Sequence, residues 1–448
     1  MGQDLQALTG RLLEAARAAG AESADAVAVA GDSLSIEVRG GILEQAERAE
    51  GVDVGLRVLL GRRQACVSSS DVRDATLAAM AERAVAMARE APEDPWCGLA
   101  DPSELARGWD AAALDLEDPE PLPAPDALEA AALAAEAAAL AVPGVTKMDA
   151  AGAGWSATRM HLAATNGFSG GYARTGHSIQ AVAICGDGTG MERDYAFESR
   201  SHRADMPDPA EIGRLAGERT AARAGAGKPP TGAWPVLYDE RVASGLVGHL
   251  VQAINGVAVA RGASWLKDAM GEPVLPPGID LVEDPFRPRI GGSRPFDGEG
   301  LPAARRALVA DGVLGSWILD LATARQLGLR STGNAGRGTW APPSPGAGNL
   351  TLTPGAVSRE ALLAEMGTGL LVTSLMGASI NPTTGDYSRG ASGFWVEKGE
   401  IVRPVNECTV AGNLRDMLRS IRPANDAKPH HSRLVPSLLV EGLVIAGS

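Results

Sequence analysis

Apolar residues in the first part of the chain change from a helical to a strand-like spacing and back. In Leu5–Ala19 they recur every three or four positions, which is typical of an amphipathic helix. Short apolar runs follow, separated by glycine-containing pairs that favour turns. Helical spacing returns in Asp74–Arg89, so the pattern predicts an antiparallel meander between two helices. The expected strands are Ala26–Ala30, Ser33–Arg39, Val52–Leu59 and Gln64–Ser68.

A second segment has the same order of elements, although no repeat is visible at the level of residues. An alanine-rich helix is expected at Ala127–Leu140, and another helix at Pro209–Ala222. The run Gly186–Gly190 lacks the spacing of a dinucleotide-binding loop and is expected to form a hairpin turn. The expected strands between the helices are Val145–Ala153, Met160–Thr165, His177–Ile184 and Glu192–Ser201.

The rest of the chain is rich in glycine and in strand-like runs. A strand at Pro235–Tyr238 precedes a long helix at Glu240–Asn255. Asp311-Gly312 and Lys398-Gly399 are pairs that favour tight hairpins. Two more helices are expected, one of which begins after Ser358, a good N-terminal cap. They are Ser358–Met366 and Ala411–Ile421.

Together these patterns predict an α+β protein with two antiparallel-sheet-plus-helix modules in the N-terminal half and a larger β-rich C-terminal domain. Proline and acidic residues are frequent at 92–125, as in an extended, solvated connector. The run AGAGKPPTG is a linker, because Pro229 stands where a phosphate loop has Ser or Thr. The expected parts are a module at 1–91, the connector at 92–125, a module at 126–223, the linker at 224–232 and the C-terminal domain at 233–448.

Charge and composition narrow the range of partners. With a net charge of −14 and no basic block, the chain repels phosphate, so no nucleic-acid partner is expected. The most apolar run, Ala130–Val142, contains Glu136 and is too short to span a bilayer, so no membrane association is expected. The first residues do not resemble a secretory signal, and the four cysteines lie far apart. These features predict a cytoplasmic protein with reduced thiols.

The sequence contains no complete catalytic motif. None of the six histidines is followed by Glu, and only His430 and His431 are close in sequence. His249 is expected to be a polar residue at a helix surface or interface rather than a ligand. The serines near glycines, at 176–178 and 390–393, do not have the spacing of a nucleophile elbow. The sequence therefore predicts no metal site and no catalytic residue in this chain.

The segment Asn381–Trp395 is the densest mixture of glycine and polar residues in the chain. Arg389 can offer a forked donor to a carboxylate or to backbone carbonyls, while Asp386 can fix that fork or hold the turn. The alternative is that Asp386 only caps a turn and Arg389 makes an internal ion pair. The candidate substrate or interface residues are Asn381, Gly385, Asp386, Ser388, Arg389 and Gly390.

This segment, with Val396–Ile401 and Glu407–Leu414, resembles the C-terminal signature of the TldD/PmbA family. The resemblance covers essentially the whole chain and is strongest from about residue 230. Further similar segments are Arg294–Leu301, Gly333–Ala335, Asn349–Leu350, Pro354–Gly355, Gly369–Thr373, Pro436–Val440 and Ala446–Gly447.

The family has two branches, and the resemblance implies to which one this chain is closer. TldD-type members carry His-Glu-x-x-x-His and a later Cys that hold zinc, whereas TldE/PmbA-type members lack them. Matching the family's glycines to Gly256 and Gly262 gives the residues at the ligand positions. None is a usual zinc ligand, so the chain resembles the TldE/PmbA branch. These residues are Val247, Gly248 and Gln252, with Arg433–Pro436 where the later Cys is expected.

The resemblance implies a cytoplasmic heterodimer with a TldD-type subunit that holds the catalytic zinc and acts on unfolded peptides and small proteins. For the isolated chain a homodimer is the expected alternative assembly. Two alternatives stay open: a stand-alone hydrolase with a non-zinc site around Asp386, Ser388 and Arg389, and a homodimer with a purely structural or binding role.

Overall fold

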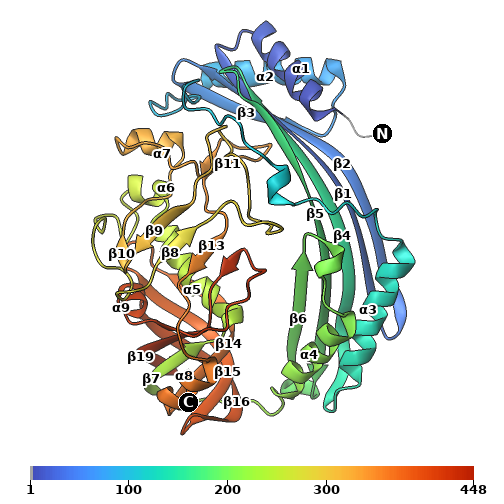
Figure 1. The fold of residues 1–448 in the computed structure, drawn as a ribbon, viewed down its shortest axis with the longest axis vertical. Coiled ribbons are helices and arrows are strands. Elements are labelled where there is room, and N and C mark those ends of the chain that lie inside the picture. Colours follow the sequence, from blue (N-terminus) through green and yellow to red (C-terminus); the bar gives the residue numbers. More distant parts are fainter. Residues whose placement is uncertain (1–3, 448) are drawn as a thin grey trace.

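The computed structural model describes residues 4–447, which form an N-terminal half built on one long sheet and a C-terminal half rich in shorter strands (Figure 1). The predicted fold class, α+β with antiparallel sheets in the N-terminal half and a β-rich C-terminal domain, is confirmed. Among these residues no helix combines the length and the apolar character that are needed to cross a bilayer.

The N-terminal half contains a six-stranded antiparallel sheet in the order β3-β2-β1-β4-β5-β6. Because β1 pairs with β4, the two predicted modules share this sheet. The predicted strands Ala26–Ala30 and Ser33–Arg39 are one strand, since Gly31 and Asp32 between them keep their pairing with β2 and β4. The strands are β1 (Ser23–Arg39), β2 (Ile42–Leu60), β3 (Arg63–Ser69), β4 (Val145–Ala164), β5 (Ser169–Cys185) and β6 (Glu192–Arg200).

Two pairs of helices cover opposite ends of this sheet (Figure 1). Strand alternation places Ala24, Ala26 and Ala28 on the face that packs against the first pair, α1 (Leu5–Ala18) and α2 (Asp74–Glu90). The second half of β1 contributes to a separate core under α3 (Pro125–Leu140) and α4 (Pro209–Ala221). The run Gly186–Gly190, which includes η2 (Gly188–Gly190), links β5 to β6 as the predicted hairpin turn.

The acidic connector lies against the sheet and includes η1 (Ala112–Leu114). The expectation that its acidic residues are solvated is wrong for Asp118, which is buried. Its carboxylate lies 3.1 Å from Nε2 of His177 and accepts a hydrogen bond of 2.7 Å from the backbone N–H of Arg203, at the start of η3 (Arg203–Asp205). These partners compensate the loss of water around the buried charge.

The C-terminal half contains a small closed barrel. β19 pairs with both β7 and β16, so the order β16-β15-β14-β7-β19 returns to its first strand, and the two-residue β17 (Arg422–Pro423) extends the sheet. The helix α5 (Glu240–Ala253) is capped by Asp239 and buries Leu246 and Leu250 in the same core. The barrel strands are β7 (Gly232–Tyr238), β14 (Gly369–Ile380), β15 (Asp386–Glu397), β16 (Glu400–Asn413) and β19 (Leu438–Ala446).

Most of the remaining elements lie on one side of this barrel (Figure 1). Asp311 and Lys398 both have positive φ and precede Gly312 and Gly399, which confirms the two predicted hairpin turns. The predicted helix Ala411–Ile421 is shorter, because its first residues pair within the barrel. The shorter helices are α6 (Gly256–Ala260), α7 (Leu321–Gln326), α8 (Arg359–Met366) and α9 (Leu414–Arg419). The outer strands are β8 (Leu281–Glu283), β9 (Arg306–Ala310), β10 (Val313–Leu314), β11 (Ala335–Gly336), β12 (Ser344–Pro345), β13 (Leu350–Leu352) and β18 (Arg433–Leu434).

The two halves meet where loops of the C-terminal half reach the long sheet. Asp25 of β1 accepts from Arg57 Nε at 2.5 Å through one carboxylate oxygen and from Arg337 Nε at 3.0 Å through the other. All three side chains are almost completely buried. Next to them, Phe296 packs edge-on against Phe168 of the N-terminal half. The junction therefore combines a buried ion-pair network with an aromatic contact.

Two more acids lie close to this junction, Asp297 and Glu299. Asp297 accepts hydrogen bonds from the backbone N–H groups of Glu299, Leu301 and Ala335, but burial still raises its pKa to about 6. Burial and the charge of Asp297 raise the pKa of Glu299 to about 8. Glu299 is therefore protonated at neutral pH and accepts a hydrogen bond from Leu321 N at 2.9 Å.

We expect Glu299→Gln to make the stability less dependent on pH. The folded state binds the Glu299 proton more tightly than the unfolded state, because the pKa is about 8 in the fold and 4.5 in the unfolded chain. The contribution of Glu299 to the free energy of unfolding is therefore full below about pH 4.5 and is lost as the pH rises to about 8. Gln keeps the acceptor for Leu321 but does not ionise. The variant should be close to the parent near pH 5 and exceed its free energy of unfolding by about 4 kcal/mol near pH 8.5. Urea unfolding at both pH values measures this difference, and equal differences at both would contradict the assignment.

Candidate functional site

The candidate residues lie on the connection between β14 and β15 and on the first part of β15. Asn381 closes the turn, since its Oδ1 accepts from the backbone N–H groups of Thr383 (3.0 Å) and Thr384 (3.2 Å). Gly385 has a φ of +83°, and a methyl group added there would lie 3.3 Å from the ring of Trp265. Both residues therefore shape the backbone of the turn.

Asp386 also belongs to the turn. Its carboxylate accepts hydrogen bonds from Thr384 Oγ1 at 2.6 Å and from Asn413 Nδ2 at 3.2 Å, and these bonds lower its pKa. Strand alternation puts Asp386, Ser388 and Gly390 on one face of β15 and Arg389 on the other. Asp386 accordingly holds the turn and does not contact the Arg389 guanidinium.

Among the described residues, the side chain of Arg389 makes one hydrogen bond, of 2.7 Å, from Nε to the backbone oxygen of Gly377. Within residues 4–447 no carboxylate lies within ion-pair distance of its guanidinium, so the alternative of an internal ion pair is not found there. Both terminal nitrogens have no hydrogen-bond partner in the same residues. A methyl group added at Gly245 of α5 would lie 4.0 Å from one of them. Arg389 thus presents free donors beside α5.

His249 lies beside this arginine, on the next turn of α5. Its ring is 5.9 Å from that of Tyr387 and nearly perpendicular to it. Burial and the positive charge of Arg389 lower the pKa of His249, so the imidazole is neutral at pH 7. Nothing in the sequence indicates that His249 and Arg389 meet. Periodicity shows which face of α5 and of β15 each side chain occupies, but not that the helix packs beside this strand.

The zinc-ligand positions implied by the resemblance do come together in space. Val247, at 1% exposure, is part of the hydrophobic core, and Gly248 offers no side chain. A methyl group added at Gly248 would lie 3.3 Å from Nη1 of Arg433, in the segment where the family's later Cys is expected. Here α5 therefore faces a cation instead of metal-binding groups, and these residues do not fit a zinc ion.

A serine-based site is also unsupported by the geometry. Ser388 is half-buried, and within the described residues its hydroxyl makes no hydrogen bond to a histidine. A serine nucleophile requires such a base to take its proton. The four cysteines are free thiols, and burial raises the pKa of the Cys408 thiol to about 11, which makes it a poor nucleophile.

Comparison with protein-family models gives three consecutive matches. Residues 24–88 match PmbA/TldA metallopeptidase domain 1, residues 117–224 match the central domain, and residues 231–447 match the C-terminal domain. The chain is 37% identical to Metalloprotease PmbA of Escherichia coli O157:H7 over 92% of its own length and 90% of that protein. It is 32% identical to a Metalloprotease PmbA homolog of Haemophilus influenzae over 100% of its own length and 97% of that protein.

Solved structures agree in fold. A protein from Bacteroides thetaiotaomicron, described as a modulator of DNA gyrase, superimposes with a TM-score of 0.92 at 26% identity, with complete coverage of both chains. TldE from Thermococcus kodakarensis has the same fold, with a TM-score of 0.85 at 20% identity, covering 98% of this chain and all of that one.

The three matched domains place the chain in the class of multidomain metallopeptidase-type proteins. More narrowly, the chain belongs to the TldD/PmbA family, as the resemblance in its sequence predicted.

Proposed function

We propose that this chain is the non-catalytic, TldE/PmbA-type subunit of a heterodimeric zinc metallopeptidase. Its partner is a TldD-type subunit that holds the catalytic zinc. The complex trims or degrades unfolded peptides and small proteins in the cytoplasm. One observation supports the proposal: at two of the positions where zinc ligands are expected, α5 carries Val247, which is buried in the core, and Gly248, which faces Arg433.

In this complex the chain contributes to binding the peptide. The free Nη groups of Arg389 can donate to a backbone carbonyl or a terminal carboxylate of a substrate. Main-chain contacts of this kind do not depend on side-chain identity, which suits a peptidase that accepts varied unfolded sequences. The role of Asn381, Gly385 and Asp386 is to hold the turn at the start of β15, while Ser388 and Gly390 line the opposite face of the strand.

Co-expression with the TldD-type subunit of the same organism tests the proposal. We expect a stable one-to-one complex that cleaves an unfolded peptide and loses activity with a zinc chelator, while this chain alone cleaves nothing. Cleavage by the isolated chain in the presence of chelator would support a stand-alone hydrolase instead. Self-association without any complex would support a structural homodimer.

Arg389→Ala should lower peptide cleavage by the complex by about 10- to 100-fold, because one charge-assisted hydrogen bond contributes roughly 1.5–3 kcal/mol. The value of kcat/KM for an unfolded peptide measures the effect, and gel filtration checks assembly. Arg419→Ala is the matched control, since Arg419 of α9 also donates from Nε to one backbone oxygen, that of Pro273 at 3.0 Å. Unchanged cleavage by an intact Arg389→Ala complex would reject the substrate role, whereas loss of assembly would indicate a structural one.

A further inference from the structure

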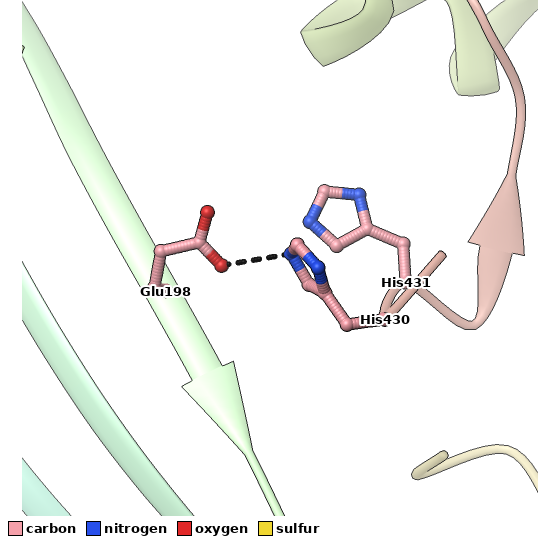
Figure 2. Close-up of side chains that lie close together, drawn as sticks. All are labelled: Glu198, His430 and His431. Carbon is pink, nitrogen blue, oxygen red and sulfur yellow. Dashed lines mark ion pairs between the residues drawn. The ribbon is translucent and has the colours of Figure 1, made fainter. Parts of the chain in front are cut away.

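Three side chains with metal-binding atoms gather where the C-terminal half approaches β6 (Figure 2). Glu198 comes from β6, and His430 and His431 come from the segment before β18. One oxygen of Glu198 and one nitrogen of each ring all lie within 4.8 Å of one another. Nε2 of His430 is already 3.0 Å from Glu198 Oε2. Small movements of the side chains would place all three around one ion.

The backbone that carries the two histidines is held firmly. The guanidinium of Arg287 donates to the backbone oxygens of Pro429 and, at 3.0 Å, His431. The backbone N–H of His431 also donates to the oxygen of Lys428 at 3.1 Å, which closes a turn. On the other side, Glu198 has a fixed register in β6, opposite Ile179 of β5. Preorganisation of this kind lowers the cost of arranging metal ligands.

Known hydrogen bonds explain only part of the cluster. Nε2 of His430 lies 3.0 Å from Glu198 but has no hydrogen-bond partner of good geometry in the described residues, and nothing there donates to or accepts from the ring of His431. The rings of His430 and His431 lie 4.5 Å apart and nearly perpendicular to each other, so they do not stack. Two half-buried imidazoles are therefore kept beside one carboxylate.

The protonation states suit metal binding. Burial lowers the pKa of both His430 and His431, so their rings are neutral at pH 7 and keep a lone pair. Glu198 is ionised, because hydrogen bonding and the charge of Arg200 lower its pKa despite burial. Arg200 donates to Glu198 Oε2 at 2.7 Å, and Lys428 lies 2.7 Å from Glu240. The two cations offset the two carboxylates, which favours moderate rather than extreme affinity for a divalent ion.

There is also space beside the three ligands. A cavity of about 140 Å³ is lined by Glu198, His431, Glu240 and Lys428. It can hold the water that would complete four-coordinate geometry around an ion with three protein ligands. Two nitrogen donors and one oxygen donor suit Zn²⁺, whereas Mg²⁺ and Ca²⁺ prefer oxygen donors alone.

We propose that Glu198, His430 and His431 bind one Zn²⁺ ion, which joins β6 of the N-terminal half to the C-terminal half. The site is separate from the zinc-ligand positions on α5, which carry Val247 and Gly248, and it does not depend on the proposed function. The sequence alone predicts no metal site, because Glu198 lies far from His430 and His431 along the chain. Only the packing of the C-terminal segment against β6 brings them together (Figure 2).

Calorimetric titration of the full chain with Zn²⁺ tests the site, using protein without a histidine tag that has been freed of metal with chelator. We expect one ion per chain with a Kd below about 10 µM, and a rise in Tm of about 2 °C at saturation. The double variant His430→Ala/His431→Ala should bind at least about 100-fold more weakly and lose the rise in Tm. Substitution with Co²⁺ gives an absorption spectrum that reports four-coordinate geometry independently.

Two further variants make the outcome decisive. Glu198→Gln keeps the shape of the side chain but removes its charge, and it should also weaken Zn²⁺ binding. This variant still tests the site if the double histidine variant folds poorly. His249→Ala is the control, because its histidine lies on α5 and should leave the titration unchanged. Binding that survives in both Glu198→Gln and the double variant, or a parent protein with no binding below about 100 µM, would overturn the proposal.

Discussion

Asp25→Asn should lower the free energy of unfolding by about 3–5 kcal/mol, since removing one partner of a buried ion pair leaves its counter-charge unpaired in the interior. In this chain two guanidinium groups depend on the one carboxylate. Arg57 donates to one of its oxygens at 2.5 Å, and Arg337 donates to the other at 3.0 Å. Side-chain exposure is 5% for Asp25, 4% for Arg57 and 0% for Arg337, so water cannot replace the lost charge.

A matched control is available in the same sheet. Asp149 of β4 pairs with Arg193 at 3.2 Å, but both side chains are exposed. Asp149→Asn should therefore change the stability by less than about 0.5 kcal/mol. Urea-induced unfolding followed by circular dichroism measures both variants. A loss of less than about 1 kcal/mol for Asp25→Asn would mean that the two arginines are satisfied without its charge.

Local sequence pattern predicted the elements of this fold better than it predicted their arrangement. The helix at Glu240–Asn255 agrees with α5 within two residues, because periodic leucines and the cap at Asp239 are local signals. The pairing of β1 with β4 is not local, since the two strands are separated by α2 and the whole connector. Alternation shows which residues share a face of a strand but not which strand lies beside it.

In the candidate site, too, local features could be predicted from the sequence and contacts between distant segments could not. The turn-forming roles of Asn381 and Gly385 could be predicted from residue chemistry, since asparagine and glycine are favoured in tight turns. The separation of Asp386 from Arg389 was missed, although it follows from strand alternation once β15 is known to begin at Asp386. The approach of Arg433 to Gly248 could not be predicted, because it depends on how the C-terminal segment packs against the rest of the domain and local patterns carry no information about that packing.

The family resemblance supplied information of a different kind. It located the ligand positions on α5 and near Arg433, which lie side by side in the fold. It gave no indication of Glu198, His430 and His431. Sequence motifs for metal sites consist of ligands that are close along the chain, and Glu198 is far from the two histidines. Sites made from distant segments, such as the junction around Asp25, become visible only from packing.

Gly55→Ala should reduce the stability by about 3 kcal/mol or more, because the added methyl group would collide with backbone that cannot rotate away. It would lie 2.5 Å from Cα of Thr339 and closer still to that residue's carbonyl oxygen. The loop around Thr339 carries Arg337, so displacing it also pulls the guanidinium away from Asp25. Gly51→Ala on the same strand is the control, since nothing lies within 4 Å of its added methyl group and its change should stay within about 0.5 kcal/mol.

The two junction variants should not be additive, because both disturb the contact between Arg337 and Asp25. Once Gly55→Ala has displaced the loop, Asp25 has only Arg57 left to pair with, and its replacement by Asn costs less. We expect the double variant Gly55→Ala/Asp25→Asn to lose at least about 1 kcal/mol less than the sum of the single losses. Hydrogen exchange of the backbone N–H groups of Ala335 and Gly346, which donate to Asp297 and to the backbone oxygen of Asn334, should become faster in Gly55→Ala but not in Gly51→Ala. Additive losses, or equal exchange in the two glycine variants, would show that the loop does not dock on the sheet at Gly55.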